Sequence, residues 1–295
     1  MSELYNIVFD PNYAFLRQTF LVSGMASLSF GIIGSFVVVR RIGYLASAIS
    51  HCAFGGIGIG LFFQKMALTA GLLTLGGLLD PIAVAVVFAV LSALLIGFVQ
   101  QRAKEREDSI IGAIWAIGMA IGILFLNATP GYFSAEAYLF GEVLLISNLG
   151  AKLVGLLGLI VLLVTGFYFK RLEAVCFDEE YFRLRGLNAA FYFQLLLVLV
   201  AVTVVLMIQL VGIILVIALL TLPAATASRL TTRLLPMACV STVLCLAFSW
   251  VGLFLSMVFD LASGPMIILV AGTVYVLVLI GCAIPAPSGN AKSKT

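Results

Sequence analysis

Long apolar runs separated by short polar segments make up most of the chain. A helix needs about 20 apolar residues to cross the hydrocarbon core of a bilayer, and the runs reach that length. A membrane β-barrel would instead show short segments of alternating polarity. The pattern therefore predicts an all-α fold, a polytopic membrane helix bundle with eight or nine transmembrane helices. The predicted spans are 17–39, 44–63, 81–100, 110–128, 150–169, 188–208, 209–228, 235–257 and 266–284.

Two segments leave the number of crossings open. Residues 188–228 form one apolar run that is too long for a single crossing, and we expect it to turn at Gln209 and Gly212. Residues 62–80 form a connector rich in Gly and Leu, with room for a short additional helix.

Composition supports a membrane protein and excludes an ordinary soluble domain. Charged residues make up only 10% of the chain and hydrophobic residues 63%, whereas a soluble domain carries roughly a quarter charged residues. The five cysteines form no CxxC pair, so we expect small buried hydrophobic side chains. The expected organisation is a single transmembrane domain over 1–285 and a short cytoplasmic tail over 286–295.

Charged residues predict the orientation, because clusters of Lys and Arg favour the cytoplasmic side. A topology with nine crossings, an outer N-terminus and an inner C-terminus places most Lys and Arg residues inside. It leaves an acidic outer face that would attract cations, although positive-inside bias alone has the same effect. The outer acidic residues that we expect to serve in docking are Glu136, Glu142 and Asp260. The basic clusters are Arg40-Arg41, Arg102/Lys104/Arg106, Lys170-Arg171 with Arg183/Arg185, Arg229/Arg233 and Lys292/Lys294.

The chain has one histidine, His51, within the second predicted span. An ionisable residue inside a membrane is costly and points to function, and neutral imidazole is a common ligand for divalent transition metals. Ser47 lies four residues earlier, on the same side of the helix. The alternative is a histidine that only packs against a neighbouring helix. Small residues further along would let another helix approach closely; they are Gly55, Gly56, Gly58 and Gly60.

No catalytic motif is evident. The sequence has no Walker A loop, and one histidine without paired intramembrane carboxylates gives little support to a hydrolase or a proton pump. The acidic run 178–180 lies near Arg183 and Arg185 in a predicted cytoplasmic loop. It is either a solvated helix face with ion pairs four residues apart or a docking site for a soluble partner. We therefore predict a non-enzymatic protein without a tightly bound cofactor.

Five segments resemble the membrane permeases of zinc-, manganese- and iron-type ABC importers. The resemblance covers most of the chain in the right order. It implies a subunit of the bacterial cytoplasmic (inner) membrane that pairs with a second copy or a related permease. It also implies cytoplasmic ATPase subunits that use ATP, and an extracytoplasmic protein that delivers the transported divalent metal ion; no nucleic acid partner is expected. The segments are GSFVVVRRIGYLASAISHCAFGGIGIG (34–60), AYLFGEVLLIS (137–147), CFDEEYFRLRGL (176–187), VGIILVIALLTLPAATASRL (211–230) and FDLASGP (259–265).

The resemblance also implies functional residues. The family motif on the second span reads Asp-x-x-x-His, and these two side chains are thought to face the pathway. Here His51 is present but Ser47 takes the Asp position, which removes the carboxylate ligand that manganese prefers. A softer or more weakly held ion would account for this departure, and so would a partner permease that supplies the Asp.

A helix after the LPAATASR motif contacts the ATPase in this family. It maps here to about 224–237, and we expect Pro223 to break the preceding helix. The expected coupling residues are Ala224, Thr226, Ser228, Arg229, Thr232 and Arg233.

A secondary metal transporter or channel that needs no ATPase is the rival interpretation. It would need intramembrane Asp or Glu for ion coupling, and no carboxylate lies in the middle of a confidently predicted span. A membrane enzyme is a third class without a candidate constellation. Zinc, manganese and iron all remain candidate ions.

Overall fold

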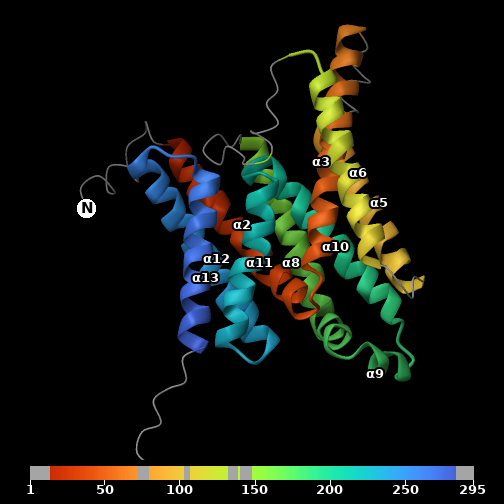
Figure 1. Ribbon diagram of the computed structural model, residues 1–295, viewed down its shortest axis with the longest axis vertical. Helices are drawn as coiled ribbons and strands as arrows, with labels where there is room; N and C mark the ends of the chain where they lie inside the picture. The colour runs from red at the N-terminus through yellow and green to blue at the C-terminus, as the bar shows by residue number, and fades with distance from the viewer. Residues whose placement is uncertain (1–13, 72–79, 103–106, 132–138, 140–147, 284–295) are drawn as a thin grey trace, which may run out of the picture.

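The computed structural model describes residues 14–71, 80–102, 107–131, 139 and 148–283 (Figure 1). Within these residues the chain forms nine long helices and one short helix, so the predicted all-α polytopic bundle is confirmed. Seven helices are long and apolar enough to cross a membrane, and α10 holds a shorter apolar stretch, Ala189–Val205. The helices are α2 (Ala14–Val39), α3 (Gly43–Thr69), α5 (Pro81–Arg102), α6 (Glu107–Ala128), α8 (Asn148–Phe177), α9 (Glu179–Leu184), α10 (Ala189–Val211), α11 (Ile213–Leu230), α12 (Leu234–Phe259) and α13 (Ser263–Ala283).

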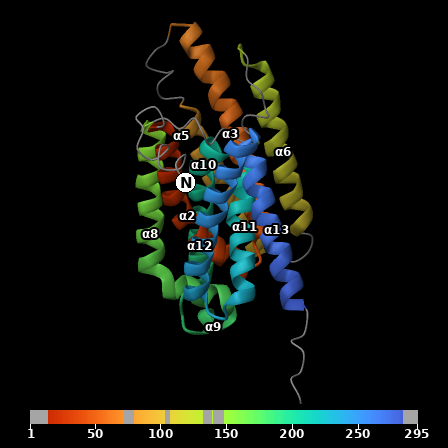
Figure 2. The same ribbon diagram turned by 90° about the vertical axis from the view of Figure 1, so that its left-hand side faces the viewer.

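Successive long helices run in alternating directions, and their junctions therefore gather at two opposite ends of the bundle (Figures 1 and 2). The α2–α3 junction, α9 and the α11–α12 junction lie at the lower end in both views. Arg40, just after α2, pairs with Glu179 of α9, and Gln101 near the end of α5 donates to the Ala190 carbonyl at the start of α10. We call this end the basic end, because it carries Arg40, Arg41, Arg183, Arg185, Arg229 and Arg233.

The long apolar run over 188–228 forms two helices, and the turn lies at Gly212, as predicted. Gly212 has φ 79° and ψ 160°, a conformation that is essentially restricted to glycine. Figure 1 shows that the chain changes direction between α10 and α11. A single glycine therefore divides one apolar run into two crossings.

Two helices extend further than predicted. α3 continues to Thr69 rather than ending at residue 63, so the first part of the expected connector belongs to it. α11 continues through Pro223 to Leu230, so the prediction that Pro223 ends the helix is wrong. Proline removes one backbone hydrogen bond, but membrane helices tolerate it where neighbouring helices pack closely. Pro223 is buried in the bundle in this way.

The cysteine prediction is only partly correct. Cys52, Cys176 and Cys245 are buried, but Cys239 on α12 and Cys282 on α13 are exposed on the surface of the chain. Both exposed thiols lie on strongly apolar helices, where lipid or a partner would cover them. Exposure in an isolated membrane chain does not imply contact with water, which is why hydrophobic cysteines can lie outside the core.

Candidate functional site

Glycines allow α3 to pack against α6 at very short range. A Cβ atom placed on Gly55 would lie 2.8 Å from the Gly118 carbonyl oxygen, and one placed on Gly58 would lie 2.6 Å from that of Gly122. Real side chains essentially never approach backbone atoms this closely. The two glycines of α3 therefore face two glycines of α6, and the two backbones touch. This confirms the expectation that the small residues of α3 let another helix approach.

The neighbouring glycines of α3 serve α5 in the same way. A Cβ on Gly56 would lie 2.8 Å from the Cα of Ala85, and one on Gly60 would lie 2.7 Å from the Cα of Pro81. The glycine-rich stretch of α3 is thus packed between α5 and α6. Most of α3 between Leu45 and Leu61 is buried as a result.

His51 lies at this contact between α3 and α6, and only 9% of it is exposed. Its Nδ1 atom is 3.3 Å from the Sδ atom of Met119, and its ring centroid is 5.2 Å from that of Trp115. A protonated Nδ1 would donate to the Met119 thioether, a weak acceptor. The Nε2 lone pair would then be the one available to a ligand, since the hydrogen bond of one ring nitrogen fixes the role of the other.

The close packing of α3 against α6 places the Met119 side chain next to His51. Gly118 precedes Met119, and a Cβ on Gly118 would lie 2.9 Å from the Cα of Cys52, the residue after His51. The two side chains are therefore brought together by backbone packing. Met119 and Trp115 are not found by sequence reasoning, because 68 residues separate His51 from Met119 and both partners lie within an ordinary apolar helix.

The other proposed pathway residue, Ser47, lies one helical turn before His51 and is half-buried. Across the described part of the chain, no group of three or more His, Cys, Asp and Glu side chains could hold a metal ion. Near His51, this chain therefore offers an imidazole, a thioether and, one turn away, a hydroxyl. Such a sparse set would bind an ion weakly, which suits passage better than storage.

The expected coupling residues fall into two groups. Ala224 and Thr226 are fully buried, and the Thr226 hydroxyl donates to the Leu222 carbonyl at 2.8 Å; neither offers a surface to a partner. The segment is also not one helix, because α11 ends at Leu230 and α12 begins at Leu234. The members that are exposed at the basic end are Ser228, Arg229, Thr232 and Arg233.

The predicted outer-face residues are only partly described. Asp260 is exposed at the α12–α13 junction, at the end opposite the basic end (Figure 1). It ends α12 in a left-handed conformation with φ 52° and ψ 46°, which Asp adopts more readily than most residues. Glu136 and Glu142 lie outside the described residues.

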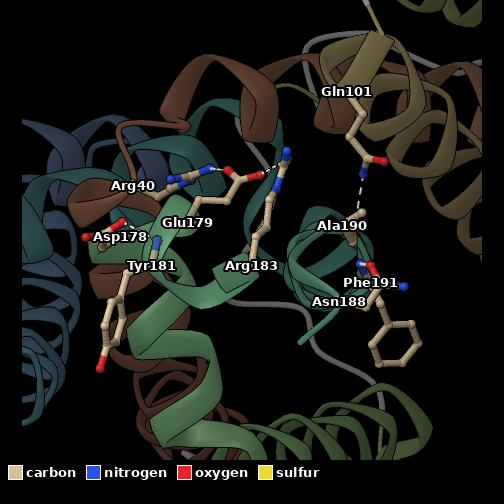
Figure 3. Close-up of polar contacts among 9 residues, drawn as sticks. All are labelled: Arg40, Gln101, Asp178, Glu179, Tyr181, Arg183, Asn188, Ala190 and Phe191. Atoms are coloured by element: carbon tan, nitrogen blue, oxygen red, sulfur yellow. Dashed lines mark hydrogen bonds and ion pairs between the residues drawn. The ribbon is translucent and has the colours of Figure 1, made fainter. Parts of the chain in front are cut away.

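The short helix α9 is held on the basic end by charged side chains (Figure 3). Glu179 pairs with Arg40 from the α2–α3 junction and with Arg183 four residues later, which bears out the ion-pair reading of the acidic run. Asp178 caps α9 by accepting from the Tyr181 backbone N–H at 2.8 Å. Asn188 caps α10 in the same way through Phe191, at 3.1 Å. These contacts fix the chain between α8 and α10.

The described residues form a polytopic bundle of membrane-length helices, and comparison with known proteins identifies its family. The model of the ABC 3 transport family matches residues 12–281. The chain therefore belongs to this family and is a permease subunit, a membrane component of an ABC transporter in the bacterial cytoplasmic membrane.

Relatives resemble the chain over nearly its whole length. A "Probable metal transport system membrane protein" of Chlamydia muridarum is 33% identical over 98% of this chain and 96% of its own. The "Manganese transport system membrane protein MntC" of Halalkalibacterium halodurans is 32% identical over 94% of this chain and 91% of its own. An uncharacterized membrane protein of Synechocystis sp. is 36% identical over 90% of both chains.

Solved structures share the fold. PsaBC from Streptococcus pneumoniae in complex with Fab is 26% identical with a TM-score of 0.81, covering 97% of this chain and 96% of that chain. An inward-facing metal-chelate type ABC transporter has a TM-score of 0.66 at 14% identity, covering 95% and 89%. The second likeness concerns the fold alone.

Loss of the Glu179 charge should loosen α9 and expose Cys176, which lies two residues before the Asp178 cap. Cys176 is buried beyond the predicted span, and burial raises the pKa of its thiol to about 12 despite the nearby Arg40, so it should react slowly with a maleimide at pH 8. Glu179→Gln removes two partly exposed ion pairs worth roughly 0.2–1 kcal/mol each. We expect labelling to become severalfold faster.

The measurement uses a Cys239→Ser/Cys282→Ser background, which removes the exposed thiols. Glu180→Gln is the matched control, because Glu180 is an exposed neighbour with the same charge. Equal labelling rates in the two variants would show that the ion pairs do not hold α9.

Proposed function

We propose that this chain is the permease subunit of an ATP-driven importer that moves a divalent transition-metal ion, zinc, manganese or iron, into the cytoplasm. The main support is the near full-length similarity to relatives named as metal or manganese transport proteins. Two cytoplasmic ATPase subunits, an extracytoplasmic metal-binding protein and a second permease copy or paralogue would complete the transporter. The basic end would face the cytoplasm by the positive-inside rule.

His51 would contact the ion during its passage. It is the one histidine of the chain, it is buried inside a membrane-spanning helix, and its Nδ1 is directed to Met119. A ligating histidine commonly donates its second ring N–H to a neighbouring acceptor, which orients the ring and fixes the tautomer. Met119 would have this positioning role and would leave Nε2 for the ion.

The nature of the donors bears on which ion passes. The relatives named MntC favour manganese. An imidazole donor suits zinc or iron better than manganese, which prefers carboxylate oxygens. Ser47, where the family motif has Asp, supplies no such carboxylate. A second permease chain that carries the Asp would restore a manganese site, so the identity of the partner chain determines the expected ion.

Replacement of His51 should impair transport without preventing assembly. In proteoliposomes that contain the complete transporter, His51→Ala should lower metal uptake at least about tenfold, because one imidazole donor is lost. Uptake at wild-type level, at equal permease content, would remove His51 from the pathway.

Met119→Leu keeps the side-chain size and removes the sulfur acceptor. It should raise the half-saturating metal concentration about tenfold while the maximal rate changes little, as expected of a residue that orients a ligand. Met207→Leu is the matched control, because Met207 is a buried methionine of α10. An unchanged half-saturating concentration in Met119→Leu would assign Met119 to packing alone.

Arg229 and Arg233 would contribute to ATPase docking, since both are exposed at the basic end. Charge reversal of both residues to Glu should abolish co-purification of the ATPase with the permease, because opposed like charges weaken an interface. Arg185→Glu, at an exposed position of the same end, is the control. Full recovery of the ATPase with the double variant would exclude these arginines from the interface.

A further inference from the structure

An apolar groove of about 420 Å³ runs between α2, α8 and α12. α2 packs against both other helices and lies between them in Figure 2. Leu28 and Ile32 of α2, Gly166 of α8, and Leu235 and Cys239 of α12 line the groove. Apart from Leu162, which lies at the middle of α8, the lining residues of α8 and α12 belong to the half of each helix that is nearer the basic end. The groove is therefore an intramembrane feature close to one membrane surface.

One polar group in the groove lacks a partner. Thr165 of α8 lines the groove, is 1% exposed, and its Oγ1 atom makes no hydrogen bond within the described structure. Thr242 across the groove bonds the Ala238 carbonyl four residues earlier, at 2.8 Å, which is the usual solution for a helical threonine. The groove therefore presents an almost wholly apolar wall to an occupant.

Basic side chains flank the groove where it approaches the basic end. The exposed Lys170 follows the lining residue Phe169, and the exposed Arg233 lies two residues before the lining residue Leu235. Arg233 occupies the N-cap position of α12 without a side-chain cap, so the first backbone N–H groups of α12 add to the positive potential. Lys170 lies five residues, about 7.5 Å of helix, beyond Thr165.

We propose that this groove binds a membrane phospholipid with an anionic headgroup. An acyl chain would fill the apolar groove, and the phosphate would lie at the basic end of the groove, near Lys170 and the first backbone N–H groups of α12. This inference goes beyond the proposed transport function and does not rest on it.

A second groove shows why the charges matter. It has a volume of about 320 Å³, lies between α3, α5 and α6, and is lined by residues such as Phe88, Leu91 and Ile117. No Lys or Arg lies within four positions of its lining residues along the chain. Both grooves would meet acyl chains in a bilayer, but only the first combines an apolar groove with basic groups at headgroup depth, the pattern of anionic-lipid sites.

The test measures lipids that remain bound to the purified full-length permease by native mass spectrometry. The wild-type protein should retain an anionic phospholipid. Gly166→Leu should abolish this retention, because a side chain at Gly166 meets open space in the groove and would fill it. Gly272→Leu on α13 is the matched control, because it also meets open space, and it should retain the lipid.

A second variant changes an exposed position, where a substitution should not disturb folding. Lys170→Gln changes an exposed side chain and should lower retention of anionic lipid about fivefold, the effect expected of one basic residue near a membrane surface, without changing zwitterionic lipid. Equal anionic-lipid retention in wild type, Gly166→Leu and Lys170→Gln would overturn the proposal. Dissociation of permease dimers by Gly166→Leu would also overturn it, since the groove would then be an interface between copies.

Discussion

The close approach of α3 to α5 and α6 is the constraint on which the candidate site depends. Alternating glycines place the backbone of α3 against both neighbours, and any side chain at Gly55 or Gly58 would push α6 away. His51 and Met119 lie at this contact, so their 3.3 Å separation follows from helix packing. In a membrane, where apolar burial gives little driving force for helix association, close packing of this kind largely holds the helices together.

The basic end organises the other features of the chain. Arg40 follows α2, precedes α3 by three residues, and pairs with Glu179 of α9. The junction at which the His51 helix begins is therefore tied to the surface at which an ATPase would dock. The same excess of positive charge favours cytoplasmic placement of this end and supplies the groups that flank the groove between α2, α8 and α12.

The sequence predicts the fold well, because each crossing needs a long apolar run and the runs are separated by charged residues or glycine. Even the turn at Gly212 could be predicted, since Gln209 and Gly212 interrupt the apolar run where two crossings must meet. Pro223 was interpreted wrongly, because its cost depends on neighbouring helices that a local rule ignores. Met119 lay beyond prediction, since its contact with His51 arises from the packing of two helices that are distant in sequence.

The most direct test of the account is the ATPase activity of the complete transporter in proteoliposomes, measured with zinc, manganese, iron and magnesium in turn. The account predicts that at least one of the three transition metals, delivered by the binding protein, stimulates ATP hydrolysis and is taken up, whereas magnesium does neither. Metal uptake that proceeds without ATP hydrolysis would contradict the account and support a secondary transporter or channel instead.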